Sequence, residues 1–172
     1  MKFILAIIFS MTFTQLVFAK NYAYIKTTGI KQGVFKGESQ KKGHETSTIV
    51  LGLSFEISTP RDASTGLPSG KRQLKPLTIT KDWGVSSGQF YTAAATNEIL
   101  KEVKIEFYSS NGREPEVLEK TIVLQNASIL SIKEVSTLVN DDLQDAESIT
   151  FAYQKITITD KSGVIFTDEL IN

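Results

Sequence analysis

The chain has 172 residues, enough for one domain with a short appendage, and its hydrophobic (41%) and charged (22%) fractions are those of a globular protein. Nineteen Lys and Arg residues balance nineteen Asp and Glu residues, so net charge gives no support for a nucleic-acid partner. The absence of cysteine excludes thiol catalysis, thiolate zinc sites and iron–sulfur clusters. The fold must therefore be held by its core alone.

The first nineteen residues have the pattern of a secretory signal peptide. Met1 and Lys2 give a positive start, an apolar run extends to Phe18, and Val17 and Ala19 are small residues at the −3 and −1 positions of a cleavage site. We therefore expect a mature chain from Lys20, periplasmic or secreted, with no stable membrane span after cleavage. An uncleaved anchor is the alternative, although the run is short for a span of about 20 apolar residues.

The first half of the mature chain predicts strands around solvated loops. Asn21–Thr28 is rich in aromatic and β-branched residues, which favour strands, and Gly29–Gly43 is a loop rich in glycine and lysine. Thr46–Ser58 alternates with a period of two, which predicts a strand with one buried face. That face carries Ile49, Leu51, Leu53, Phe55 and Ile57.

A polar loop, Thr59–Gly70, follows this strand and is punctuated by prolines and glycines. Lys71–Lys81 resumes as a strand with Leu77 and Ile79 in phase. Pro76 indicates an edge or a bulge there, because proline has no amide hydrogen to donate. We expect two strands that flank one long projecting loop.

One helix is expected, and β-structure returns after it. Gln89–Thr96 predicts two or three turns with Phe90, Ala93 and Ala94 facing inward, and Ser86-Ser87 offers an N-cap. The later segments are an alternating strand from Leu100 through Phe107, a turn at Asn111-Gly112, a long strand Val117–Lys133 kinked near Asn126, an acidic loop Asn140–Glu147, a strand Ser148–Thr159 whose apolar phase changes, and a short strand Val164–Phe166. This pattern predicts a mainly β protein, either a compact barrel or a sandwich, with one short helix.

No motif in the chain predicts catalysis, a cofactor or a metal. Gly66–Lys71 resembles a phosphate loop, but its glycine spacing is one residue short and a strand follows in place of a helix. His44 is the only histidine and has no nucleophile elbow to serve, so we expect a hydrogen-bonded histidine where a strand starts. The run Asn140-Asp141-Asp142 with Asp145 lacks the spacing of an EF-hand calcium loop.

A set of short motifs occurs in order along the chain, namely Lys42–Glu45, Pro60–Ala63, Gly70–Gln73 with Lys75-Pro76, Ile79–Lys81, Thr96–Glu98, Lys104–Phe107, Asn126-Ala127 and Phe151–Ile156. Together these motifs resemble the haemolysin-coregulated protein (Hcp) family, the tube proteins of the bacterial type VI secretion system. The resemblance covers roughly residues 22–168. It implies a six- to seven-stranded antiparallel β-barrel with one short flanking helix, over residues 20–172.

The resemblance also implies a structural role without an active site. Six copies would close into a ring, rings would stack into a hollow tube, and the lumen would hold secreted effector proteins. The partners implied are other copies of the chain, effectors and other type VI secretion components. By the same resemblance, the long loop is expected to contact a neighbouring subunit through Pro60, Arg61, Asp62, Lys71, Arg72 and Gln73.

The signal-peptide pattern of the first nineteen residues departs from this family, whose members leave the cell through the secretion apparatus itself. An exported Hcp-like β-barrel binding module that does not build the tube is therefore the alternative function.

Overall fold

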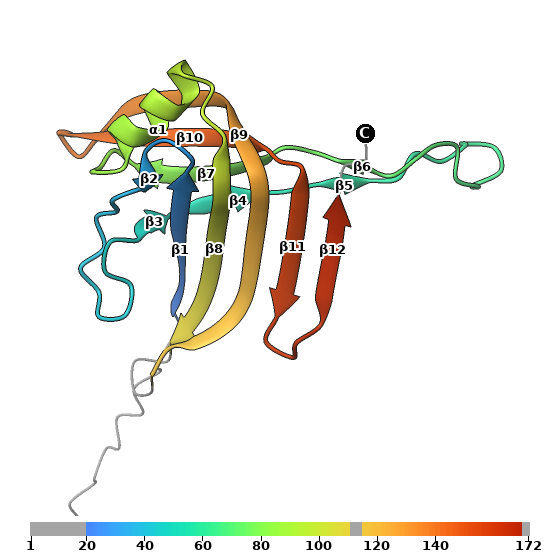
Figure 1. The fold of residues 1–172 in the computed structure, drawn as a ribbon, viewed down its shortest axis with the longest axis horizontal. Helices are drawn as coiled ribbons and strands as arrows, with labels where there is room; N and C mark the ends of the chain where they lie inside the picture. The colour runs from blue at the N-terminus through green and yellow to red at the C-terminus, as the bar shows by residue number, and fades with distance from the viewer. Residues whose placement is uncertain (1–19, 111–114, 170–172) are drawn as a thin grey trace, which may run out of the picture.

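The computed structural model describes residues 20–110 and 115–169, so the leader and the Asn111-Gly112 turn lie outside the described residues. The described chain is mainly antiparallel β-structure with one α-helix, as the sequence predicted (Figure 1). The elements are β1 (Lys20–Gly29), β2 (Gly33–Val34), β3 (Thr48–Val50), β4 (Gly52–Ser54), β5 (Ile57–Ser58), β6 (Gln73–Leu74), β7 (Leu77–Asp82), α1 (Ser87–Ala95), β8 (Leu100–Ser110), β9 (Val117–Val139), β10 (Asp142–Ala152), β11 (Lys155–Asp160) and β12 (Ile165–Glu169).

The main sheet curls around a single core. Its strands lie in the order β2, β1, β8, β9, β10, β7, β4, and every neighbouring pair is antiparallel. Strands β3 and β4 are separated by Leu51 alone, yet β3 pairs with β1 and β4 pairs with β7. The two ends of the sheet therefore meet at this segment, which gives a barrel-like shape although no unbroken ladder closes it.

Strand β9 is long enough to pair with different strands along its two halves. Its first half pairs with β8 and β11, and its second half pairs with β10. Asn126 lies between the halves with φ 49°, a left-handed conformation that asparagine tolerates better than most residues. The kink predicted near Asn126 is confirmed.

Aliphatic side chains on the inner face form rungs across neighbouring strands. Ile25, Ile105 and Ile122 are register partners, and each is at most 2% exposed. Leu124 and Ile156 pair in the same way and are fully buried. Full burial of such a side chain is worth about 1.5–3 kcal/mol, so these rungs supply the stability that a chain without disulfides needs.

Helix α1 packs its apolar side on this core. Phe90 is buried, and its ring meets that of Phe35 edge-on with 5.1 Å between centroids; Ala93 is buried as well. The helix begins at Ser87, and Ser86 stands at the N-cap position without a capping bond from its side chain. The predicted inward face is confirmed for Phe90 and Ala93, whereas Ala94 is half-buried and the predicted Ser86 cap hydroxyl is not used.

The buried face predicted for Thr46–Ser58 is wrong in part. Val50, expected on the wetter face, is 7% exposed, whereas Ile49 and Leu51 are 42% and 57% exposed. Ile57, farther along, is also exposed. At Leu51 the backbone stops pairing with β1 and begins to pair with β7. The positions that face the core shift there by one residue, so a single alternation does not hold throughout Thr46–Ser58.

Two later segments also differ from prediction. Asn140–Glu147 is not an acidic loop, because β10 begins at Asp142 and only Asn140-Asp141 forms the turn. Both turn residues have positive φ, 51° and 63°, as a two-residue hairpin of the primed type requires. The strand predicted over Ser148–Thr159 is interrupted at Tyr153-Gln154, which accounts for its change of apolar phase.

Candidate assembly surface

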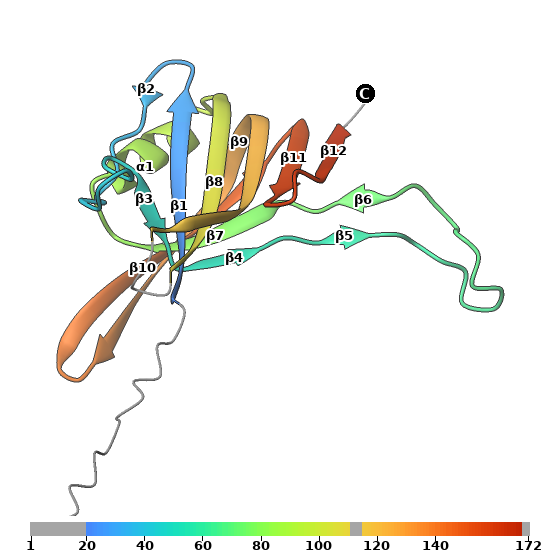
Figure 2. The same cartoon turned by 90° about the horizontal axis from the view of Figure 1, so that it is seen from below.

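A two-stranded arm projects from the body. Strands β5 and β6 continue β4 and β7 outward, as Figure 2 shows. The arm (residues 56–75) is paired at Ile57 with Leu74, and the Lys75 amide donates to the Glu56 carbonyl at 3.1 Å. Every residue in the range 61–73 is exposed. Packing within the described chain therefore does not explain why this ribbon extends so far.

Hydrogen bonds order the arm tip (residues 61–71). One carboxylate oxygen of Asp62 accepts from the amides of Ser64 and Thr65, at 3.0 and 2.8 Å, and from the Thr65 hydroxyl at 2.9 Å. These donors, Thr65 first, lower the pKa of Asp62 below its usual value. The Arg61 guanidinium donates to the Gly66 carbonyl at 3.0 Å, and Gly66 adopts φ 69°, which glycine does without strain. The tip is a folded turn before any partner arrives.

The six residues predicted for a subunit contact all lie on this arm. Pro60, Arg61 and Asp62 are on its outgoing side and Lys71, Arg72 and Gln73 on its returning side. Arg72 is tied to the body, since its guanidinium lies 2.5 Å from the Asp168 carboxylate on β12. Lys71 forms no ion pair with any described residue. Their contact with a partner stays a prediction.

A second exposed surface was missed by the sequence reasoning. The tip of the β9–β10 hairpin is a regular strand pair that exposes Leu138 (66%) and Leu143 (60%), and Trp83 beside it is 52% exposed. A hairpin could have been predicted here, because Leu138 and Leu143 lie at equivalent positions on either side of the Asn140-Asp141 turn.

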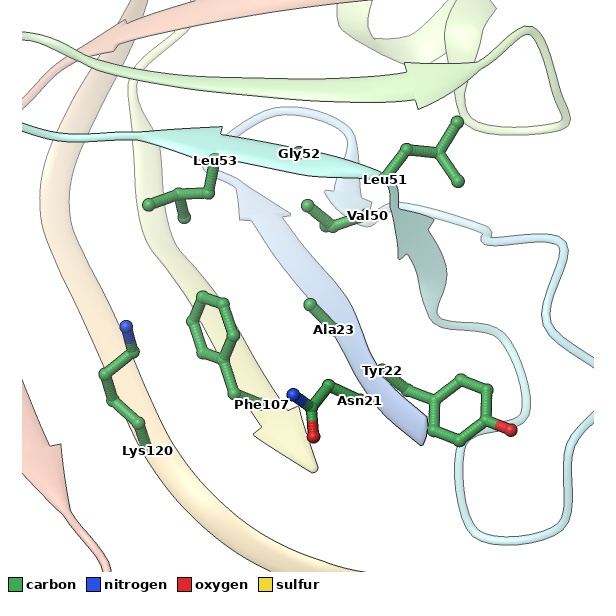
Figure 3. Close-up of a pocket in the computed structure, with 9 residues that line it drawn as sticks. All are labelled: Asn21, Tyr22, Ala23, Val50, Leu51, Gly52, Leu53, Phe107 and Lys120. Atoms are coloured by element: carbon green, nitrogen blue, oxygen red, sulfur yellow. The ribbon is translucent and has the colours of Figure 1, made fainter. Parts of the chain in front are cut away.

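An open pocket of about 300 Å³ lies between β4 and the ends of β1, β8 and β9 (Figure 3). Its lining is Asn21, Tyr22, Ala23, Val50, Leu51, Gly52, Leu53, Phe107 and Lys120. Leu53 and Phe107 also pack against the core, and the Lys120 ammonium lies 4.1 Å from the centre of the Phe107 ring. A mostly apolar lining with one cation suits binding of an apolar group better than proton transfer.

His44 belongs to a buried aromatic cluster. Its ring stacks on Tyr24 with 4.1 Å between centroids and meets Tyr108 edge-on at 4.5 Å. Its Nε2 lies 2.8 Å from a Glu116 carboxylate oxygen. Burial would raise the pKa of Glu116, but Lys41 and His44 together lower it. The expected hydrogen-bonded histidine is confirmed.

The remaining tested motifs lie in turns. The glycine-rich stretch 66–71 leads into β6 and not into a helix, so it has no phosphate-loop geometry. Within residues 20–110 and 115–169, no three His, Asp or Glu side chains gather to hold a metal ion. The described part of the chain also contains no helix with the length and apolar character to cross a membrane.

Comparison with known proteins assigns the family. The family profile described as Type VI secretion system effector, Hcp, matches residues 24–159. The chain is 32% identical over 161 residues to the Major exported protein of Pseudomonas aeruginosa, covering 86% of this chain and 94% of that protein. The chain belongs to the Hcp family.

Solved Hcp structures share the fold of this family member. A crystal structure of an Hcp protein matches with a TM-score of 0.80 at 24% identity, over 87% of this chain and 99% of that one. The secreted protein Hcp3 from Pseudomonas aeruginosa matches with a TM-score of 0.73 at 27% identity, over 89% and 100%. The resemblance seen in the sequence is confirmed: the chain is an Hcp-family protein of type VI secretion.

Proposed function

We propose that the mature chain, residues 20–172, is a structural subunit that closes into hexameric rings. The rings stack into a hollow type VI secretion tube whose lumen holds secreted effector proteins. Family membership supports the tube-like role. The arm supports the assembly, because it reaches beyond the body in an ordered form.

The arm carries this proposal. Fixing one residue of backbone costs about 1–2 kcal/mol, and an exposed ribbon recovers little of that cost from its own packing. A neighbouring copy that covers the arm supplies the missing contacts. Since the arm differs from the body it would touch, the contact is heterologous, and heterologous contacts close into rings or continue into stacks.

Light scattering coupled to size-exclusion chromatography, with electron microscopy of the same fractions, tests the proposal on the mature chain. We expect the mass of six copies and rings with a central opening. Arg61→Ala with Lys71→Ala should weaken stacking while the folded body keeps its circular dichroism. A strict monomer at high protein concentration would sink the proposal.

The alternative function is an exported Hcp-like binding module that does not build a tube. The pocket in Figure 3 favours it, because its apolar lining with Lys120 at one side is a place where a small partner group would fit. This module would be a monomer, and arm substitutions would leave its mass unchanged. The light-scattering experiment therefore separates the two functions.

We also propose that residues 1–19 direct general export and are removed. Sequencing of the N-terminus of the protein recovered from the periplasm or the medium should start at Lys20. A start at Met1 in the exported protein would contradict cleavage and leave the assembly proposal intact.

A further inference from the structure

The tip of the β9–β10 hairpin presents an apolar face that no described residue covers. Leu138 and Leu143 are direct register partners, 66% and 60% exposed. Alternation along the strands places them on the same side as Ile132 and Ile149, which contribute to the core. The side of the sheet that is buried in the body thus continues, uncovered, onto the hairpin.

Trp83 widens this face from the neighbouring strand. Its amide donates to the Asp145 carbonyl at 3.0 Å and so extends the β7–β10 ladder by one residue. Lys81, two residues earlier, is buried, and alternation puts Trp83 on that same side. The Trp83 ring lies 5.8 Å from that of Tyr91, the helix residue at this edge. The Tyr91 hydroxyl donates to the Glu134 carboxylate on β9 at 2.9 Å. Leu138, four residues farther along β9, is exposed.

This hairpin face (Trp83, Leu138 and Leu143) has an acidic surround. The stretch from Lys133 to Asp145 holds one basic residue and four acidic ones, namely Glu134, Asp141, Asp142 and Asp145. An open hollow of about 410 Å³ beside Trp83 is lined by Asp82, Trp83, Gln144 and Asp145. An exposed apolar patch with a charged border is typical of a protein–protein contact.

The arm has the complementary composition. Its basic residues are Arg61, Lys71, Arg72 and Lys75, against the acidic Glu56 and Asp62. Leu67 at its tip is 65% exposed. The arm and the hairpin project in opposite directions from the body in both views (Figures 1 and 2), so the arm cannot reach the hairpin of its own chain.

We propose that the hairpin face of one copy is the docking site for the arm tip of a second copy. Leu67 packs against the hairpin face, and Arg61 and Lys71 lie over its acidic surround. Opposite charges steer the two elements together and fix their register, while the leucines exclude water. This inference rests on the proposed assembly and names the surface that receives the arm.

The cysteine-free chain makes the contact measurable by crosslinking. Leu67→Cys in one preparation and Leu143→Cys in another, distinguished by a mass tag, are mixed under mild oxidation at an assembling concentration. We expect disulfide-linked pairs of the two unlike variants, because a disulfide needs Cα atoms within about 7 Å. The matched control replaces Leu143→Cys by Val164→Cys, which is as exposed (65%) as Leu67 but lies at the β11–β12 turn. The hairpin pair should form about tenfold more product than the control pair.

The outcomes separate this inference from the proposed function. Rings without a preference for the Leu143 position would overturn the docking site and leave the assembly standing. Preferential crosslinking in a protein that forms no rings would support the docking site and refute the ring. Absence of both would overturn both.

A charge exchange tests the same contact without cysteines. Asp145 lies on the same side of the sheet as Leu143, two residues away, and lines the hollow beside Trp83. Lys71→Glu alone and Asp145→Lys alone should each weaken assembly about tenfold, and the double variant should recover most of it, because the opposite charges are then exchanged across the contact. Circular dichroism checks that each variant is folded. A folded double variant as weak as the two single variants would show that the arm docks elsewhere.

Discussion

Two regions of this chain, the body beneath α1 and the arm, treat charged side chains in opposite ways. In the body, Lys81 and Glu147 are completely buried, and the Lys81 ammonium donates to Glu147 at 2.8 Å, to the Ser87 hydroxyl at 2.9 Å and to the Asp82 carbonyl at 2.6 Å. On the arm, Lys71 is exposed and forms no ion pair with another described residue.

The difference separates charge that builds the fold from charge that is left for a partner. The buried pair joins β7, β10 and the first residue of α1, because Ser87 also donates to Glu147 at 2.6 Å. Serine, lysine and glutamate are residue types that also occur in catalytic sites. Here Lys81 and Glu147 are not accessible to solvent, so their contact serves the fold. The arm is the reverse, accessible and held by few contacts with the body.

The largest expected loss of stability comes from breaking the buried pair. Lys81→Met leaves the Glu147 carboxylate buried without its cation, and we expect the free energy of unfolding to fall by about 3–5 kcal/mol. Urea denaturation of the mature protein measures this change. Lys81→Met combined with Glu147→Leu should recover most of the loss, because no uncompensated charge remains. If the single variant were as stable as the parent, the pair would not anchor the helix.

A smaller loss is expected at Glu98, which holds the β1–β2 turn. Its carboxylate accepts from the amides of Lys31 and Gln32, at 2.6 and 2.8 Å, and from the Gln32 side chain at 2.8 Å. Burial would raise the pKa of Glu98, but these donors outweigh burial and lower it. Glu98→Gln should cost about 2 kcal/mol at neutral pH, since charged hydrogen bonds are replaced by weaker ones.

The pH dependence of this contribution follows from the lowered pKa. A carboxyl group whose pKa is lower in the folded state stabilises the fold above its unfolded pKa, about 4.3, and the contribution is lost as the pH falls through the folded value. The gap in stability between the parent and Glu98→Gln should therefore close on acidification. Glu102→Gln, an exposed change on β8, is the control and should show no such gap. A gap at Glu98 that is independent of pH would contradict this account.

The sequence predicted those strands that keep the same side toward the core along their whole length. The alternating strand predicted from Leu100 through Phe107 is confirmed: Val103 and Ile105 are fully buried on one side of β8. Alternation failed at Leu51, where the backbone passes between layers, a change that depends on pairing with two distant strands. The β9–β10 hairpin was missed because acidic residues masked its leucine alternation. The pair of Lys81 and Glu147 is separated by 66 positions, so no local pattern announces it.

The projecting loop was predicted because proline and glycine mark it, and the family resemblance assigned it a partner. The sequence did not predict that the arm has a defined direction and a folded tip. Its direction follows from the ladders of β4 and β7, and its tip turn follows from the hydrogen bonds to Asp62.

The smallest change in global stability is expected at that tip. Asp62→Ala removes the acceptor of the Ser64 and Thr65 amides, so residues 59–70 should exchange amide hydrogens faster, while the denaturation midpoint stays that of the parent because the tip contributes nothing to the core. The lowered pKa of Asp62 predicts that the parent tip also loosens on acidification, once the carboxylate is protonated. Hydrogen exchange followed by mass spectrometry measures both effects.

Asp160→Ala is a matched control for the arm, because Asp160 holds the β11–β12 turn in the same way. One of its carboxylate oxygens accepts from the Ser162 amide, the Ser162 hydroxyl and the Val164 amide, and its pKa is lowered by these donors, the hydroxyl first. Each variant should loosen its own turn without unfolding the body. Only Asp62→Ala should also weaken assembly, since only that turn presents the arm tip to a second copy. Equal loss of assembly in both variants would mean that turn order in general, and not the arm, controls the contact between copies.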